Sequence, residues 1–230
     1  MLSQDRLSSL SCFDCHALKS NDRQECLSYY NMKNEPERFR NTLLANWRTL
    51  DFPFSSDTAT RLGIYYSLLT RWNDRLHLVA PCSPEEFATR HVLESLVLLE
   101  HLPPGAKIAD IGSGAGLPII PCLIARPDLD ATLIESSQKK AVFLREALKE
   151  VGRKGAIIAR RFEEIEAPDV AFVTARALDQ FIHKIPVLLN WAPDGCTLLL
   201  FGGEKLLDAE RFLIPGSEKR YLYVKRDLRG

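Results

Sequence analysis

The stretch Lys107–Pro118, KIADIGSGAGLP, decides the fold of this 230-residue chain. An apolar run over 107–111 passes directly into a loop with glycine at three alternate positions. Such a run is typical of a buried strand, and the glycines let the backbone turn sharply and approach a ligand closely. In an open α/β sheet, ligands lie at the carboxyl ends of the strands. The loop after residue 111 is therefore the first candidate for a ligand site.

Strand-like and helix-like stretches alternate downstream of this loop, which predicts an α/β fold with a mostly parallel, helix-covered sheet. A last strand over 221–224 is expected to join the sheet antiparallel. Further strands are expected at 131–134, 156–159, 170–174 and 197–201, with helices at 118–126, 137–151 and about 177–190.

The region upstream of the loop has a helical pattern. Apolar residues recur at spacings of three and four from Leu62 to Leu76, which places them on one helix face. A second helix is expected to begin at Ser83-Pro84, an N-cap followed by proline at the first position, and to end before residue 103. We therefore expect a helical region at 51–104 and a ligand-binding domain at 105–230, together forming one globular unit.

Residues 1–50 differ from the rest because they are polar and carry little apolar periodicity. We expect a poorly structured extension here, helical at most from residue 32. Its Cys12, Cys15, His16 and Cys26 could together bind zinc, but a plain extension without metal is the favoured interpretation. No stretch resembles an export signal or a membrane span, so we expect reduced thiols and a cytoplasmic protein.

The glycine loop favours S-adenosylmethionine over a dinucleotide. In a GxGxxG fingerprint the third glycine would fall at Leu117, so the pattern here is DxGxGxG. Asp110, expected to face the ligand, would disfavour a pyrophosphate but suits the ammonium and sulfonium of S-adenosylmethionine. Glu135, at the end of the second strand, is expected to accept hydrogen bonds from both ribose hydroxyls of either cofactor. A dinucleotide, or a tight turn with no ligand, remain the alternatives.

These motifs, taken in order, resemble the bacterial small-subunit ribosomal RNA guanine-N7 methyltransferase family (GidB). The resemblance covers about residues 57–205. One departure is Phe201, which stands where the family usually has lysine. The matching pieces are Arg90-His91, Glu94-Ser95 (the family has aspartate before the serine), the loop 110–118, Glu135-Ser136 with Lys139-Lys140, the stretch 161–164, and Ala175-Arg176-Ala177.

The resemblance implies a Rossmann-like class I methyltransferase fold and methyl transfer to N7 of a guanine near the decoding region of 16S ribosomal RNA. Guanine N7 has a free lone pair, so no general base is required, and catalysis would rest on alignment and electrostatics. Arg176 is the expected catalytic residue, orienting base or cofactor; its alternative is an ion pair with Asp179 or Glu163. Expected cofactor-binding residues are Asp110, Gly112, Ser113, Gly114, Gly116, Leu117, Glu135, Ser136, Phe162, Glu163 and Arg176.

Charge composition bounds how RNA could be bound. The chain has 30 basic and 30 acidic side chains, so recognition must rely on a small basic patch and on shape. Expected partners are small-subunit ribosomal RNA or the 30S particle, bound by a monomer, with neither DNA nor membrane involved. A diverged relative acting on another RNA or small molecule, or a regulatory protein without methyltransferase activity, is the alternative. Expected RNA-binding residues are Arg90, His91, Lys139, Lys140, Arg145 and Arg161, with Arg160 as the alternative to Arg161 for a phosphate contact.

Overall fold

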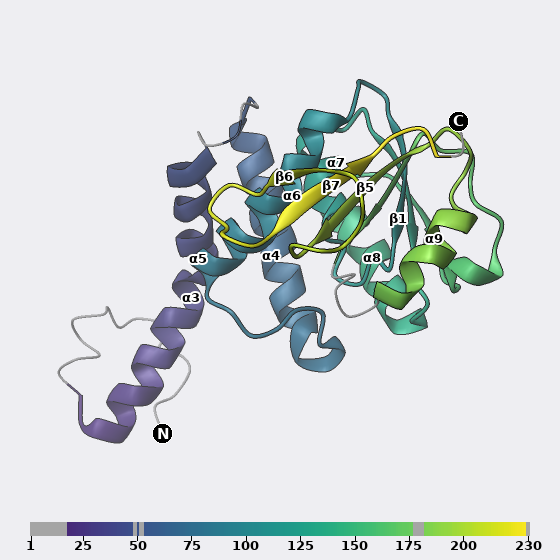
Figure 1. Cartoon of the computed structure of the whole chain (residues 1–230). Helices are drawn as coiled ribbons and strands as arrows, with labels where there is room; N and C mark the ends of the chain where they lie inside the picture. Colours follow the sequence, from purple (N-terminus) through teal and green to yellow (C-terminus); the bar gives the residue numbers. More distant parts are fainter. Residues whose placement is uncertain (1–17, 48–49, 51–52, 177–181, 229–230) are drawn as a thin grey trace.

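A computed structural model describes residues 18–47, 50, 53–176 and 182–228 (Figure 1). Its centre is a seven-stranded sheet in the order β3-β2-β1-β4-β5-β7-β6. The first five strands in that order are parallel, and β7 pairs antiparallel with both β5 and β6. The strands are β1 Lys107–Ile111, β2 Asp130–Ile134, β3 Ala156–Ile158, β4 Phe172–Ala175, β5 Thr197–Gly202, β6 Glu210–Leu213 and β7 Tyr221–Lys225.

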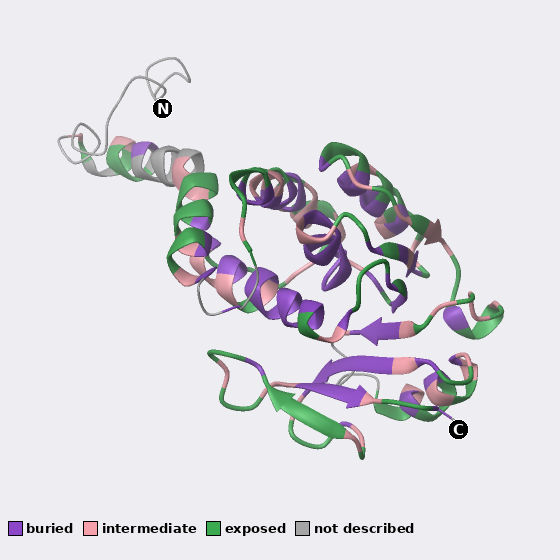
Figure 2. Cartoon of the chain, turned by 90° about the horizontal axis from the view of Figure 1, so that it is seen from above, coloured by how far each residue is buried: buried purple, intermediate pink, exposed green. Residues whose placement is uncertain are grey.

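This topology confirms the expected mostly parallel sheet with an antiparallel C-terminal strand. The strand β6 was not predicted. All four of its residues are exposed, so it has none of the apolar alternation by which a half-buried strand is recognised. Figure 2 shows β6 exposed along its length, whereas the central strands are buried on both faces.

Two apolar cores lie on the two faces of the sheet. The larger joins one face of the sheet to α4 (Ser56–Leu76), α7 (Ile119–Ala125) and α8 (Gln138–Glu150). The smaller joins the other face to α9 (Ile185–Trp191), which begins later than the predicted helix; residues 177–181 of that prediction lie outside the described part. Because neighbouring residues of a strand point to opposite faces, Ile108 belongs to the larger core and Ala109 to the smaller.

The helix α3 (Ser20–Asn46) corrects the expectation of a poorly structured extension. It begins twelve residues before the expected residue 32. Its Phe39 and Leu43 are fully buried in the larger core, and the Phe39 ring stacks on Tyr66 with centroids 4.6 Å apart. These two buried apolar residues are four positions apart in a largely polar stretch. The sequence therefore shows little of the apolar face by which an amphipathic helix is recognised. The second half of α3 is part of the globular unit.

Cys26 corrects a second expectation about the same region. It lies in α3, is 1% exposed and is disulfide-bonded, so it is neither a reduced thiol nor a free zinc ligand. Cys12, Cys15 and His16 lie outside the described residues. Within the described ranges, no three His, Cys, Asp or Glu side chains are grouped to hold a metal ion.

The predicted second helix is a continuous helical segment over 84–101 with an unusual middle. Ser83 caps it, its Oγ accepting from Glu86 N at 3.1 Å. The segment consists of α5 (Pro84–Glu86), the π-helix η2 (Phe87–Leu93), α6 (Glu94–Leu96) and the 3₁₀-helix η3 (Val97–His101). A π-turn within a helix is rare and occurs frequently at functional sites. None of the helices described in the structure is long and apolar enough to cross a membrane.

Candidate functional site

The glycine loop is held against the end of β2 by its own backbone. Gly112 N donates to Ile134 O at 2.8 Å, and Ser113 N donates to the same oxygen at 3.2 Å. Gly116 has φ +83°, and a Cβ at this position would collide with the Ile120 side chain of α7. Glycine is therefore required here by both the backbone conformation and the close approach of α7.

Gly116→Ala is expected to be the most destabilising alanine substitution in this loop. Ala in the left-handed region costs about 1–2 kcal/mol, and the contact with Ile120 adds to that cost. Gly112 has a similar φ of +68° but open space around its Cβ position, so Gly112→Ala isolates the backbone term. Thermal unfolding should show the larger loss of Tm for Gly116→Ala. Equal losses would contradict the role of Ile120.

A cavity of about 530 Å³ lies at the carboxyl ends of β1, β2 and β4, against the glycine loop. Its size is within the range of small-molecule sites. It therefore lies where the fold predicts a ligand. The lining residues are Ile111, Gly112, Gly114, Ile134, Glu135, Ser136, Lys140, Arg160, Arg161, Phe162, Glu163, Arg176, Lys184 and Leu188.

Glu135 lies at this cavity, as expected from its place after β2, and also holds the loop. Its Oε2 accepts from Gly114 N at 2.9 Å, and its Oε1 accepts from Ser137 N at 2.7 Å. The carboxylate is therefore fixed by charge-assisted hydrogen bonds at both oxygens. Each oxygen can accept a further hydrogen bond, so the group remains able to bind the hydroxyls of a ligand.

Asp110 does not face the cavity, which corrects its expected position. It is fully buried on the sheet face of Ile108, and neither carboxylate oxygen has a hydrogen-bond partner among the described residues. Burial, reinforced by the nearby Glu135 charge, raises the pKa of Asp110 to about 8. The prediction that Asp110 faces the ligand is wrong because side chains alternate along the strand, so that Ile111 and not Asp110 points toward the cavity.

Asp110 should make stability fall as pH rises. Between about pH 4 and 8 the folded protein keeps a proton on Asp110 that the unfolded chain releases, so each rise in pH favours unfolding. Asp110→Asn should flatten this dependence, because asparagine does not titrate. Tm measured from pH 5 to 8 in both proteins tests this; parallel curves would refute it.

Three further loop residues expected at the ligand do not line the cavity. Ser113 is 2% exposed and its Oγ donates to Asp110 O at 3.0 Å. Leu117 is buried in the larger core. Gly116 lies against α7 and, like the other two, does not line the cavity.

The far wall of the cavity is aromatic and basic. Phe162 is 8% exposed and packs edge-on against Trp191, with centroids 5.5 Å apart. Glu163 forms an ion pair with Lys184, with a distance of 2.6 Å between Oε1 and Nζ. It is therefore not the partner of Arg176, although that pairing was one of the two considered for the arginine. Five cationic side chains line the cavity against two carboxylates. Lys184 comes from a stretch without any sequence motif, and nothing in the sequence pointed to it.

Arg176 lies at the cavity and is turned toward the helical segment 84–101. Its Nη1 donates to His91 O at 3.1 Å and Ser95 Oγ at 3.2 Å, and its Nη2 donates to Arg90 O at 2.8 Å. The predicted partner Asp179 lies outside the described residues. Burial and the Arg176 charge lower the pKa of His91 to about 3, so this imidazole is neutral.

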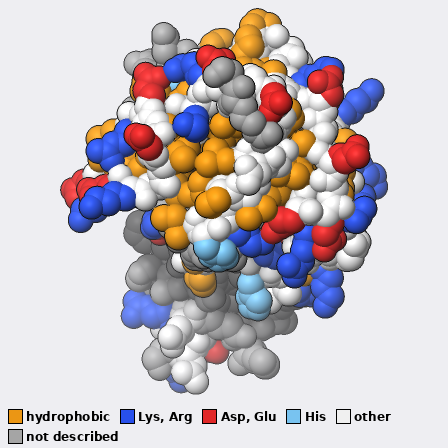
Figure 3. Space-filling view, turned by 45° about the vertical axis from the view of Figure 1, so that its right-hand side comes forward, with side chains coloured by type: hydrophobic (Ala, Val, Ile, Leu, Met, Phe, Trp, Pro, Cys, Tyr) orange, Lys and Arg blue, Asp and Glu red, His pale blue; other side chains and the backbone are white. Residues whose placement is uncertain are grey.

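The expected RNA-binding residues divide into two groups. Lys140 and Arg161, together with the alternative Arg160, line the cavity. The others lie outside its lining: Lys139 and Arg145 are exposed on α8, Arg90 is exposed and pairs with Glu86 at 2.8 Å, and His91 is half-buried beside Arg176. Figure 3 shows that acidic and basic side chains are mixed around the face it presents, with apolar side chains gathered between them. No large single-sign surface is visible on that face.

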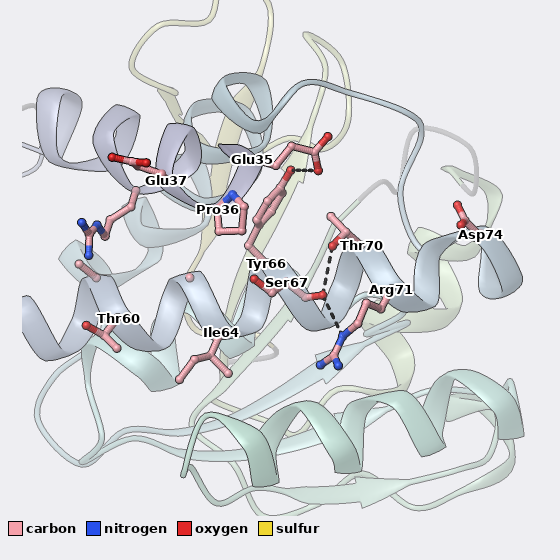
Figure 4. Close-up of a pocket in the computed structure, with 13 residues that line it drawn as sticks. Glu35, Pro36, Glu37, Thr60, Ile64, Tyr66, Ser67, Thr70, Arg71 and Asp74 are labelled. Carbon is pink, nitrogen blue, oxygen red and sulfur yellow. Dashed lines mark hydrogen bonds between the residues drawn. The ribbon is translucent and has the colours of Figure 1, made fainter. Parts of the chain in front are cut away.

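A larger hollow, of about 1140 Å³, lies between α3 and α4 (Figure 4). Its lining mixes charges of both signs, among them Glu35, Arg40 and Asp74. Tyr66 spans it, donating from its hydroxyl to Glu35 Oε2 at 3.4 Å. It contains no residue of the glycine loop or of the strand ends, so the smaller cavity is the candidate site.

Comparisons with known proteins place the chain in a family. The family model for rRNA small subunit methyltransferase G (GidB) matches residues 58–211. The chain is 40% identical over 202 residues to the "Ribosomal RNA small subunit methyltransferase G" of Sorangium cellulosum, covering 83% of this chain and 82% of the relative. It is 41% identical to the protein of the same name from Xanthomonas campestris pv. campestris (strain B100), covering 74% and 87%.

Among solved structures, the chain resembles an RNA methyltransferase from Salinibacter ruber in complex with S-adenosyl-L-homocysteine. The TM-score is 0.50 and the identity 17%, covering 66% of this chain and 95% of the other. At this identity the likeness concerns the fold alone. Together with the strand order, it agrees with the expected class I methyltransferase fold.

Proposed function

Because the chain belongs to the rRNA small subunit methyltransferase G family, we propose that it transfers a methyl group from S-adenosylmethionine to N7 of a guanine in small-subunit ribosomal RNA, near the decoding region. The cofactor would occupy the 530 Å³ cavity. We further propose that it acts as a monomer in the cytoplasm, with the RNA or the 30S particle as its substrate and neither DNA nor membrane as a partner.

The observation that carries this proposal is the combination of Glu135 with a basic rim. Glu135 is a fixed acceptor at the end of β2, suited to ribose hydroxyls. Lys140, Arg160 and Arg161 border the same cavity, where they can contact the phosphates of a bound RNA. The methyl donor would therefore bind in the cavity, and the RNA that accepts the methyl group would bind at the adjacent basic rim. A small-molecule or regulatory relative, the alternative, would not require such a rim.

The residues of the chain would act by binding and alignment. S-adenosylmethionine supplies an electrophilic methyl group, and guanine N7 supplies the lone pair that takes it. Phe162 offers an apolar wall for the cofactor, and the loop backbone from Gly112 to Gly114 permits its close approach. Arg176 orients the base or cofactor from the end of β4. No residue need remove a proton, so proximity and orientation account for catalysis.

The direct test is tritiated methyl transfer to small subunits, or to their RNA, that lack the modification. Nucleoside analysis should find N7-methylguanosine in RNA treated with the protein. The same assay compares free RNA with assembled 30S particles as substrates. Absence of N7-methylguanosine above background from both would rule out this function and favour the small-molecule or regulatory alternative.

The basic rim predicts salt-dependent RNA binding. Lys140→Ala and Arg161→Ala should each weaken RNA binding without regard to sequence, and each should lower the slope of log K against log salt by roughly 1 at most. Exposed Lys154, in the loop between α8 and β3 and outside the lining of the cavity, gives the matched control Lys154→Ala. Filter binding at several salt concentrations measures the slopes. An unchanged slope in both rim variants would remove them from the RNA contact.

A further inference from the structure

Glu94 is a buried carboxylate that joins three segments distant in sequence. Its side chain is 5% exposed. Its Oε1 lies 2.5 Å from Arg220 Nη2, in the turn between β6 and β7, and its Oε2 lies 3.3 Å from Arg176 Nη2, just after β4. Glu94 itself lies in the helical segment 84–101. One carboxylate therefore meets two guanidinium groups, and Arg176 is the one that lines the cavity.

The two arginines share this carboxylate. Arg220 holds both of its oxygens, since its Nη1 also donates to Oε2 at 3.0 Å. Arg176 is the more deeply placed of the two, with a side chain 17% exposed against 33% for Arg220. Without Glu94, two like charges would face each other in a poorly solvated place, where their repulsion is strong. The remaining partners of Arg176 named above are neutral oxygens, which carry no opposite charge to cancel that repulsion.

We propose that Glu94 is a positioning residue for methyl transfer: by neutralising Arg220 it keeps the Arg176 guanidinium at the cavity mouth. This inference rests on the proposed function, and it assigns to Glu94 no contact with cofactor or RNA. Arg176 packs beside the Phe201 ring, 5.9 Å from its centroid, so a neutral ring lies on that side. The ion pair with Glu94 therefore adds an opposite charge to the neutral contacts that also hold the guanidinium.

The test is a double-mutant cycle between Glu94→Gln and Arg176→Ala. Glu94→Gln keeps the size of the side chain and removes its charge. We expect it to lower kcat/KM roughly 10- to 100-fold in the otherwise native chain, since small misplacements of a catalytic group have effects of that order. In the Arg176→Ala background it should lower kcat/KM less than about threefold, because a residue that acts through Arg176 has nothing left to position.

Controls and alternatives make each outcome decisive. Glu100→Gln is the matched control: it is the same change on the same helical segment, at an exposed side chain. Equal losses in both backgrounds, or no loss in the native background, would overturn the proposal. If Glu94→Gln does not fold, as circular dichroism would show, Glu94→Asp takes its place, because it keeps the charge and withdraws the carboxylate by one methylene.

A second readout separates this proposal from the proposed function. If the native chain methylates no small-subunit RNA, the proposed function fails, and the same cycle is then read from the Kd for S-adenosylmethionine by calorimetry. Arg176 lines the cavity, so its displacement by Glu94→Gln should weaken cofactor binding several-fold in the otherwise native chain. In the Arg176→Ala background the same change should leave the Kd unaltered. A Kd that Glu94→Gln leaves unchanged in that case, or changes equally in both backgrounds, would overturn the role of Glu94.

Discussion

Replacing Glu135 by alanine is expected to weaken S-adenosylmethionine binding roughly 100-fold. Hydrogen bonds to a charged group contribute about 1.5–3 kcal/mol each, and about 1.4 kcal/mol is a tenfold change in Kd. The variant would lose the acceptors for the ribose hydroxyls. It would also lose the two bonds that hold Gly114 N and Ser137 N, so the loop would no longer be held ready for the cofactor.

Calorimetric titration of the purified variant measures this effect. Glu150→Ala is the matched control, because Glu150 is an exposed carboxylate at the end of α8, away from the cavity. Glu135→Gln separates the two contributions: it can keep one acceptor oxygen but loses the charge, so its Kd should fall between those of the native chain and the alanine variant. A native-like Kd for Glu135→Ala would remove Glu135 from the cofactor site.

Replacing Arg176 by alanine is expected to lower kcat/KM for RNA methylation by about 100- to 1,000-fold, the range found when a group that orients or stabilises the reacting atoms is removed. The side chain lines the cavity and is held by the carbonyl oxygens of Arg90 and His91. Its removal leaves a gap in the cavity wall and frees the π-helical segment from β4.

Steady-state methyl transfer with small subunits as substrate tests this expectation. Arg75→Ala, at an exposed arginine near the end of α4, is the matched control. Arg176→Lys should recover little activity, because a single ammonium cannot reproduce the forked contacts of a guanidinium. An Arg176→Ala protein within threefold of the native kcat/KM would show that Arg176 has no part in the reaction.

Most of the sheet could be predicted because its strands are short apolar runs followed by recognisable turns. The five parallel strands lie within one to two residues of their expected ends. The full extent of α3 and the strand β6 were not expected, for a common reason: a polar sequence hides an element whose stability comes from packing or pairing elsewhere in the chain. Phe39 reveals its role only where it meets Tyr66 and Phe87, and Leu43 only where it enters the larger core.

The candidate site was predicted in part for similar reasons. Glu135 and the glycine loop were found because their position in the chain, at a strand end, determines their position in space. Asp110 lies one residue before the end of β1, and the alternation of the strand turns it into the core. Glu94 and Arg220 are 126 residues apart, and no local pattern indicates that they meet.

The π-helix η2 affects how this chain can evolve by deletion. A π-turn contains more residues than the 3.6 of an α-helical turn, so Phe87–Leu93 holds a surplus residue. Deleting one residue there should let the segment relax into ordinary α-helix at little cost to folding, because the surplus residue is what the π-turn accommodates and the flanking turns keep their places. The carbonyl of Arg90, which now accepts from Arg176, would then point elsewhere. A one-residue deletion is thus a short mutational route from an active chain to a folded, inactive one.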